Sequence, residues 1–310
     1  MNKPKVIVIC GPTASGKTSL SIELAKQING EIVSADSMQI YEDMNIGTAK
    51  PTVEEMDGIK HYLIGGISPT VRYSVADYKK AALSAIDEIL KKGKTPIVVG
   101  GTGLYVDSLV YGIDYDDVEV DLEYRNKLEN IANEKGLEYL YNEAKKIDPQ
   151  AMEKISINDQ KRILRVLEIY NATGKTKTEQ EIESRSKENP YDYYVFAIDM
   201  EREKLYERIN KRVDIMLEQG LVDEVKQVTE KYKNLPTAIQ GLGYKEVIEY
   251  LNGNCSYEEM VEKIKIETRH YAKRQLTWFR KNKDIVWING LDKKQNNIDI
   301  ILKGVNGGEK

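Results

Sequence analysis

The fold of this chain is decided by the stretch Val6-Ile7-Val8-Ile9-Cys10-Gly11-Pro12-Thr13-Ala14-Ser15-Gly16-Lys17-Thr18. Its apolar, largely β-branched first part is typical of a strand buried on both faces of a parallel sheet. Its second part, from Gly11 to Thr18, matches the phosphate-binding pattern G-x-x-x-x-G-K-S/T, which joins such a strand to a helix. Backbone amides of such a loop hold phosphate oxygens, the lysine neutralises the distal phosphates, and the hydroxyl meets Mg²⁺. The stretch therefore predicts an anion site, and it leaves open whether the anion is ATP or another di- or polyphosphate.

Strand and helix patterns alternate outward from this loop. Further strands are predicted at 31–34, 95–99, 194–198 and 285–288, and helices at 19–27, 75–92, 202–218, 222–232 and 257–282. This alternation predicts an α/β fold, a P-loop NTPase-like parallel sheet with helices on both faces.

One part of the chain departs from that alternation. From about residue 121 to 186 the strand patterns are replaced by helical ones, which predicts an all-helical insertion domain. We therefore expect an α/β core made of residues 1–118 and 191–310, carrying a basic C-terminal helix, and an insertion at 119–190. The glycine-rich end, residues 303–310, is expected to fray.

Composition excludes several classes of protein. Lys and Arg number 46 and Asp and Glu 50, so the net charge of −4 does not by itself indicate a nucleic-acid binder. The apolar runs are far shorter than the roughly 20 residues of a membrane span, and no membrane association is expected. Two cysteines and two histidines cannot build a disulfide framework or a His-rich metal site. The first residues do not match a secretory signal, so we expect a cytoplasmic protein.

A second candidate segment is Ser34-Ala35-Asp36-Ser37-Met38-Gln39-Ile40-Tyr41. Asp36 directly follows a predicted strand, at the sheet edge where ligands of such folds bind. It is either a catalytic carboxylate or the N-cap of a short helix. The polar neighbours Ser37 and Gln39 favour a site.

A basic stretch lies near the end of the chain. Residues 261–283 contain eight Lys or Arg against two Glu. Its cations alternate with aromatic residues: Arg269, Tyr271, Lys273, Arg274, Trp278, Phe279 and Arg280. Aromatic rings that can stack on bases, next to cations that can bind phosphates, indicate a binding site for single-stranded RNA. The alternative is that these charges only form a solvated helix face.

Six motifs, in this order, resemble those of bacterial tRNA dimethylallyltransferases. They are residues 11–18, 34–41, 45–51 (Asn-Ile-Gly-Thr-Ala-Lys-Pro), 99–105 (Val-Gly-Gly-Thr-Gly-Leu-Tyr), 159–162 (Asp-Gln-Lys-Arg) and 240–245 (Gln-Gly-Leu-Gly-Tyr-Lys). The resemblance implies transfer of a dimethylallyl group from dimethylallyl diphosphate to N6 of adenosine 37, beside the tRNA anticodon, with release of diphosphate. It also implies that the helical insertion grips the anticodon stem-loop, and we expect a monomer.

The resemblance assigns roles to individual residues. Catalysis is assigned to Asp36, Thr18, Lys17 and Thr102, and the metal Mg²⁺ to Thr18. The diphosphate is assigned to Gly11, Pro12, Thr13, Ala14, Ser15, Gly16, Lys17 and Thr18. Contact with tRNA is assigned to Asp36, Ser37, Met38, Gln39, Thr102, Arg125, Gln160, Lys161, Arg162, Ile163, Leu164, Lys273, Arg274, Gln275 and Trp278.

Three other functions remain open from the residues. A P-loop kinase would use Asp199 as a weak substitute for a Mg²⁺ ligand, or leave it as a helix cap, with a lid of Arg202, Arg208 and Arg212. A nucleotide-regulated RNA-binding protein would bind tRNA and transfer nothing. A transferase acting on a free adenine nucleotide is disfavoured, because so small an acceptor needs neither the insertion nor the basic helix.

Overall fold

The computed structural model describes residues 3–114 and 121–307. The chain divides into two compact units, residues 1–110 with 190–310, and residues 111–189. The predicted boundary between residues 118 and 119 lies outside the described residues. Among the described residues, no helix combines the length and the apolar character needed to cross a membrane.

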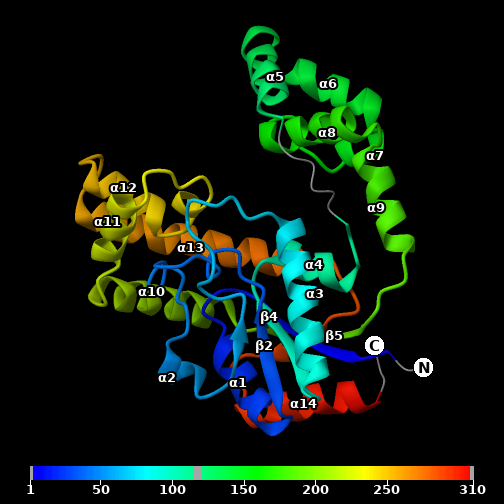
Figure 1. Cartoon of the computed structure of the whole chain (residues 1–310). Coiled ribbons are helices and arrows are strands. Elements are labelled where there is room, and N and C mark those ends of the chain that lie inside the picture. Colours follow the sequence, from blue (N-terminus) through cyan, green and yellow to red (C-terminus); the bar gives the residue numbers. More distant parts are fainter. Residues whose placement is uncertain (1–2, 115–120, 308–310) are drawn as a thin grey trace. The chain divides into compact units, whose positions relative to one another are not determined.

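The first unit is built on a six-stranded sheet with the order β3-β2-β4-β1-β5-β6 (Figure 1). Its strands are β1 (Lys5–Cys10), β2 (Gly30–Ser34), β3 (His61–Tyr62), β4 (Thr95–Gly100), β5 (Asp192–Asp199) and β6 (Val286–Asn289). Every neighbouring pair is parallel, as the continuous apolar runs predicted. β3 was not predicted, because two residues are too few to form a pattern.

Both faces of the sheet are covered by helices. Alternate residues of β1 point to opposite faces: Val6 and Val8 pack with α3 (Val75–Lys91) and α4 (Gly103–Val110), and Ile7 and Ile9 with α1 (Lys17–Gln27). The predicted fold class is therefore confirmed.

The C-terminal segment corrects one prediction. α14 (Lys294–Gly307) covers the same face as α1 and buries Ile298, Ile301 and Val305. Burial of each such side chain stabilises the fold by about 1.5 to 3 kcal/mol, so the prediction that residues from 303 onward fray is wrong up to Gly307.

The remaining helices of this unit pack around a core of their own. They are α2 (Val53–Met56), α10 (Arg202–Glu218), α11 (Leu221–Lys231), the 3₁₀ turn η1 (Ala238–Gln240), α12 (Tyr244–Leu251) and α13 (Tyr257–Phe279). The core joins Val213 of α10, Val225 of α11, Tyr244 of α12 and Met260 of α13. It also takes in Tyr41, so it lies next to the segment that follows β2.

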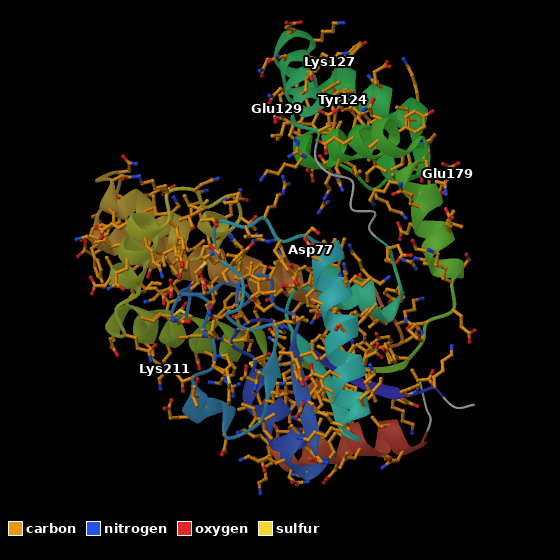
Figure 2. The ribbon with its side chains drawn as sticks, in the orientation of Figure 1. Asp77, Tyr124, Lys127, Glu129, Glu179 and Lys211 are labelled. Atoms are coloured by element: carbon orange, nitrogen blue, oxygen red, sulfur yellow. The ribbon has the colours of Figure 1, made fainter. Side chains whose placement is uncertain are left out.

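The second unit is helical in its described part. It contains α5 (Leu122–Lys135), α6 (Leu137–Ile147), α7 (Pro149–Met152), α8 (Gln160–Thr173) and α9 (Lys177–Ser186). Leu128 of α5 is buried in the core, whereas its neighbours Lys127 and Glu129 are exposed (Figure 2).

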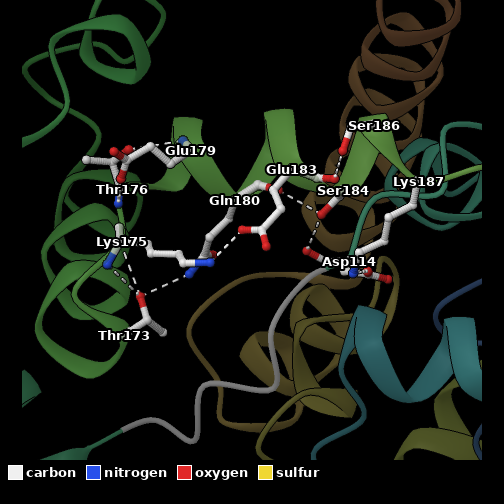
Figure 3. A network of polar contacts seen from close by, with 10 residues as sticks. All are labelled: Asp114, Thr173, Lys175, Thr176, Glu179, Gln180, Glu183, Ser184, Ser186 and Lys187. Atoms are coloured by element: carbon white, nitrogen blue, oxygen red, sulfur yellow. Dashed lines mark hydrogen bonds and ion pairs between the residues drawn. The ribbon is translucent and has the colours of Figure 1, made fainter.

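Helix α9 is held by hydrogen bonds rather than by a broad apolar face (Figure 3). Thr176 caps its start, because its hydroxyl accepts the Glu179 amide at 3.0 Å. Gln180 donates its amide to the Thr173 hydroxyl at 3.0 Å. At the other end, the Lys187 ammonium pairs with Asp114 at 2.7 Å. These contacts fix both ends of α9 within the unit.

Candidate functional site

One cavity opens at the carboxyl ends of β1, β2 and β4, entirely within the first unit. Its wall combines the phosphate loop, the ends of the strands, the loop after β2 and two helices. The lining residues include Thr13, Lys17, Thr18, Ser34, Asp36, Gln39, Thr48, His61, Gly100, Gly101, Arg212, Tyr271 and Gln275. The sequence analysis placed the 11–18 loop and Asp36 at this edge, and the structure brings them into one cavity.

Within the phosphate loop, the Lys17 ammonium lies against the loop backbone. The Lys17 ammonium donates to the Pro12 carbonyl at 2.6 Å, and the Ser15 hydroxyl donates to the same carbonyl at 2.8 Å. Burial, and then the charge of Arg212, lower the pKa of Lys17 to about 8. An anion that entered the loop would oppose both effects and favour the charged lysine.

Arg212 of α10 is a site residue that the sequence analysis assigned only to the kinase alternative. Its guanidinium lines the cavity. Burial lowers the pKa of Arg212, and the charge of Asp36 acts in the opposite direction. Four residues earlier on the same helix, the Arg208 guanidinium lies next to Gly16 of the phosphate loop. Residues spaced four apart share one helix face, so α10 presents two arginines to this loop.

Asp36 serves a structural purpose and keeps an oxygen for chemistry. Its Oδ1 accepts the amides of Met38 and Gln39, at 2.9 and 3.3 Å, and so caps the turn at residues 37–40. The alternative prediction of a short helix at this position is wrong, because no helix begins at these described residues. Among the described residues, no hydrogen bond to Oδ2 is seen. Capping and catalysis are therefore compatible in this side chain.

Thr102 joins the loop after β4 to the loop after β2. Its hydroxyl accepts the Ser37 amide at 3.1 Å and donates to the Ser37 hydroxyl at 3.4 Å. Tyr271 of α13 interacts with Thr102 and Gln275, and burial followed by the charge of Asp36 raises its pKa to about 12. Tyr271 therefore enters the cavity as a neutral hydroxyl.

Two residues predicted to contact tRNA after β2 are half-buried and also make contacts within the protein. The Gln39 amide donates to the carbonyls of Thr48 and Ala49 at 3.1 and 3.2 Å. The Met38 side chain packs against the core shared by α10 to α13. These contacts use Gln39 and Met38 to fix the neighbouring loop.

Glu224 is the anchor that the sequence analysis missed. Its buried carboxylate accepts the amides of Asn45, Ile46 and Gly47 at 2.7 to 2.9 Å, and the Tyr244 hydroxyl at 2.6 Å. Thus the motifs at 45–51 and 240–245, quoted above without a chemical role, meet at one side chain. No local pattern marks Glu224 as an anchor, because the amides that it binds lie far away in the sequence.

Helix α13 is anchored by residues that were expected to touch RNA. The Trp278 indole donates to Asp107 at 2.9 Å, and Phe279 is buried. Gln275 is 5% exposed and bonds two loops of the cavity. The Phe279 ring is buried and cannot stack on RNA bases, so that prediction is wrong. Trp278 is half-buried, and its contact with RNA stays a prediction.

The cations at the end of α13, together with Arg280 directly after it, fall into two groups. Lys273 and Arg274 are exposed, and Arg274 lies over the Tyr271 ring, 5.7 Å from its centre. Arg280 pairs with Asp199 at 3.1 Å, which occupies the carboxylate that the kinase alternative required. Asp199 also accepts the Met200 amide at 3.0 Å, but it does not cap the next helix as predicted, because the N-cap of α10 is Glu201.

The residues of the insertion that were predicted to contact tRNA divide into an exposed group and a buried group. Gln160, Lys161 and Arg162 are exposed at the start of α8. Ile163 and Leu164 are buried in the helical core, so their side chains are not available to RNA.

Arg125 has a partner inside the same unit. It binds the buried Glu168 through two nitrogens, at 2.6 and 3.0 Å. This pair joins α5 to α8 and gives Arg125 a structural role that the sequence analysis did not predict.

The cavity suits a divalent cation that is held mainly by the oxygens of a bound diphosphate and only in part by the protein. Thr18 offers a hydroxyl to the cation, and the described residues contain no cluster of three or more metal-binding side chains. Mg²⁺ is commonly held by one or two protein oxygens, phosphate oxygens and water, so the site fits it.

A family model described as IPP transferase matches residues 39–282. The chain belongs to the IPP transferase family. The family resemblance expected from the motifs is thereby confirmed.

Individual members of the IPP transferase family match almost end to end. The chain is 56% identical to the tRNA dimethylallyltransferase of Acetivibrio thermocellus, over 92% of this chain and 91% of the relative. It is 47% identical to the tRNA dimethylallyltransferase of Bacillus cytotoxicus, over 94% and 92%.

Solved structures agree with these sequence matches. The full-length tRNA isopentenylpyrophosphate transferase of Bacillus halodurans superposes with a TM-score of 0.74 at 41% identity, covering 98% of each chain. A eukaryotic dimethylallyltransferase acting on tRNA gives a TM-score of 0.83 at 33% identity, covering 98% of this chain and 80% of that one.

Proposed function

We propose that this member of the IPP transferase family transfers the dimethylallyl group of dimethylallyl diphosphate to N6 of adenosine 37 in tRNA, releasing diphosphate. One observation carries the proposal: a phosphate loop, Arg212 and a carboxylate with an unused oxygen meet at a single cavity, and Arg208 lies next to Gly16 of the same loop. The identity to named tRNA dimethylallyltransferases supports the same reaction.

The leaving group is handled by fixed positive charge. As the bond between the allylic carbon and oxygen breaks, negative charge grows on the diphosphate. Lys17, Arg212 and the amides of the 11–18 loop stabilise that charge in place, which lowers the barrier to bond breaking. Mg²⁺ on Thr18 would supply further positive charge when bound.

The acceptor end needs a base. The adenine N6 amine is a poor nucleophile, because its lone pair is delocalised into the ring. Asp36 Oδ2 accepts the N6 proton as the new C–N bond forms, while Oδ1 stays bound to the Met38 and Gln39 amides and fixes the carboxylate. The neutral Tyr271 hydroxyl lines the same end and orients the base, and Thr102 holds the neighbouring Ser37 in place.

We assign tRNA binding to two exposed cationic groups. Lys161 and Arg162 are exposed on the helical unit, which we propose grips the anticodon stem-loop. Lys273 and Arg274 are exposed on α13. We further propose that the enzyme acts as a monomer in the cytoplasm, where its tRNA substrate is found.

Mass analysis of tRNA after incubation with dimethylallyl diphosphate and Mg²⁺ tests the function. We expect a gain of one C₅H₈ unit and release of diphosphate. Consumption of ATP with no change in tRNA mass would favour the kinase alternative. Stable tRNA binding with no transfer would favour a binding protein.

A further inference from the structure

Gln275 is a buried amide that connects two loops of the cavity. Its Oε1 accepts the Thr13 amide at 2.8 Å, and its Nε2 donates to the Gly101 carbonyl at 2.9 Å. The side chain is 5% exposed, so these bonds are shielded from water. Both ends of the amide are thus committed to backbone.

The two loops serve opposite ends of the proposed reaction. Thr13 belongs to the phosphate loop, whereas Gly101 precedes Thr102 at the acceptor end. The sheet does not fix their separation, because the register of β1 with β4 ends at the pair Cys10 and Gly100. Gln275 spans the two loops beyond that edge.

The loop after β4 is shaped for this helix. A Cβ on Gly101 would lie 2.1 Å from Gln275 Nε2, and a Cβ on Gly103 would lie 2.3 Å from Trp278 Cδ1. Only glycine permits so close an approach at both positions. Trp278, almost one turn after Gln275, is fixed in turn by its bond to Asp107.

We propose that Gln275 is a positioning residue for the transfer step, a role that rests on the proposed function. It sets the distance between the diphosphate loop and the acceptor loop, and so between the allylic carbon and the amine that attacks it. Misplacement of reacting groups by about 1 Å can cost on the order of 10²-fold in rate, although each substrate still binds.

The test is Gln275→Met, which keeps the length of the side chain and removes both hydrogen bonds. We expect single-turnover transfer to slow by roughly 10- to 100-fold. Affinities for dimethylallyl diphosphate and for tRNA, measured by calorimetry and filter binding, should stay within about threefold of wild type, because the binding groups of each loop remain. Thr277→Ala, an exposed change on the same helix, is the control and should alter none of these values.

Two results would overturn the proposal. An unchanged transfer rate with a lowered melting temperature would make Gln275 purely structural. A loss of tRNA affinity with a normal rate at saturating tRNA would make it an RNA contact. If Gln275→Met does not fold, Gly101→Ala, whose Cβ displaces Nε2 from the other side, should show the same loss of rate at unchanged affinity, and a normal rate would contradict the role. Failure of the proposed function is distinct, because wild type itself would then transfer nothing.

Discussion

Lys17 connects the electrostatics of the cavity with substrate binding. Its pKa of about 8 means that it gives up its proton just above neutral pH in the free protein. Binding of the diphosphate favours the protonated lysine. We expect the affinity for dimethylallyl diphosphate to fall as the pH rises through about 8, since binding must then be accompanied by uptake of a proton.

Calorimetry between pH 7 and 9.5 in buffers of different ionisation enthalpy measures this proton uptake. Lys17→Arg, which stays charged throughout, is the control for titration of the ligand itself. Identical pH profiles for the wild type and Lys17→Arg would contradict the assignment.

A substitution at Asp36 distinguishes its role as a cap from its proposed role as a base. Asp36→Asn keeps an oxygen for the Met38 and Gln39 amides but cannot take a proton. We expect normal folding and a transfer rate lower by about 10² to 10⁴-fold. An Asn oxygen can accept the same two turn amides, so near-normal turnover would leave Asp36 with the turn-capping role alone.

At the scale of elements, Glu224 determines where the 45–51 loop lies. Glu224→Gln replaces one acceptor oxygen by a donor that faces backbone amides. We expect about 2 to 3 kcal/mol of destabilisation, as for a buried unsatisfied group, with loss of transfer because Thr48 and Pro51 line the cavity.

Urea unfolding and transfer assays measure both effects. Asp223→Asn, on the exposed side of the same helix, should change stability by less than about 1 kcal/mol. Equal behaviour of the two variants would refute the anchoring role.

Helix α13 and Arg280 directly after it contain both free and committed cations, which makes a matched comparison possible. Replacing Lys273 or Arg274 with Ala should weaken binding of any tRNA. Each change should also reduce the salt slope of log affinity by roughly 0.7 to 0.9 for each RNA phosphate that is no longer neutralised. Arg280→Ala removes an equal charge that is already paired with Asp199, and it should leave the slope unchanged.

Filter binding at several salt concentrations gives the three slopes. A slope that responds to Arg280 but not to Lys273 or Arg274 would mean that RNA approaches a different face of the helix.

At the scale of the whole molecule, the sequence carried the fold better than the site. Buried strands and the phosphate loop are local patterns, so β1, α1 and the parallel sheet were predictable from residues near one another. Helix α14 was not predictable, because the glycines near residue 304 concealed the helical spacing of the apolar residues Ile298, Ile301 and Val305.

Site residues were harder to predict because their roles depend on distant partners. Gln275 and Trp278 match a motif on a basic helix, yet their bonds to Gly101 and Asp107 make them anchors. No local sequence pattern indicates the role of Glu224, because the backbone amides that it accepts lie almost 180 positions earlier in the chain. Motif matching identified the functional segments, and only the fold showed which of them meet and which side chains stay exposed.

The central claim is that the cavity joins an allylic carbon to an exocyclic amine. It is tested by giving the enzyme two anticodon stem-loop RNAs that differ only at position 37, one with adenosine and one with purine riboside, which lacks the N6 amine. After incubation with dimethylallyl diphosphate, mass spectrometry of the digested RNA should find one added C₅H₈ unit on the adenosine and none on the purine. Addition to both RNAs, or to neither while ATP is consumed, would contradict the account.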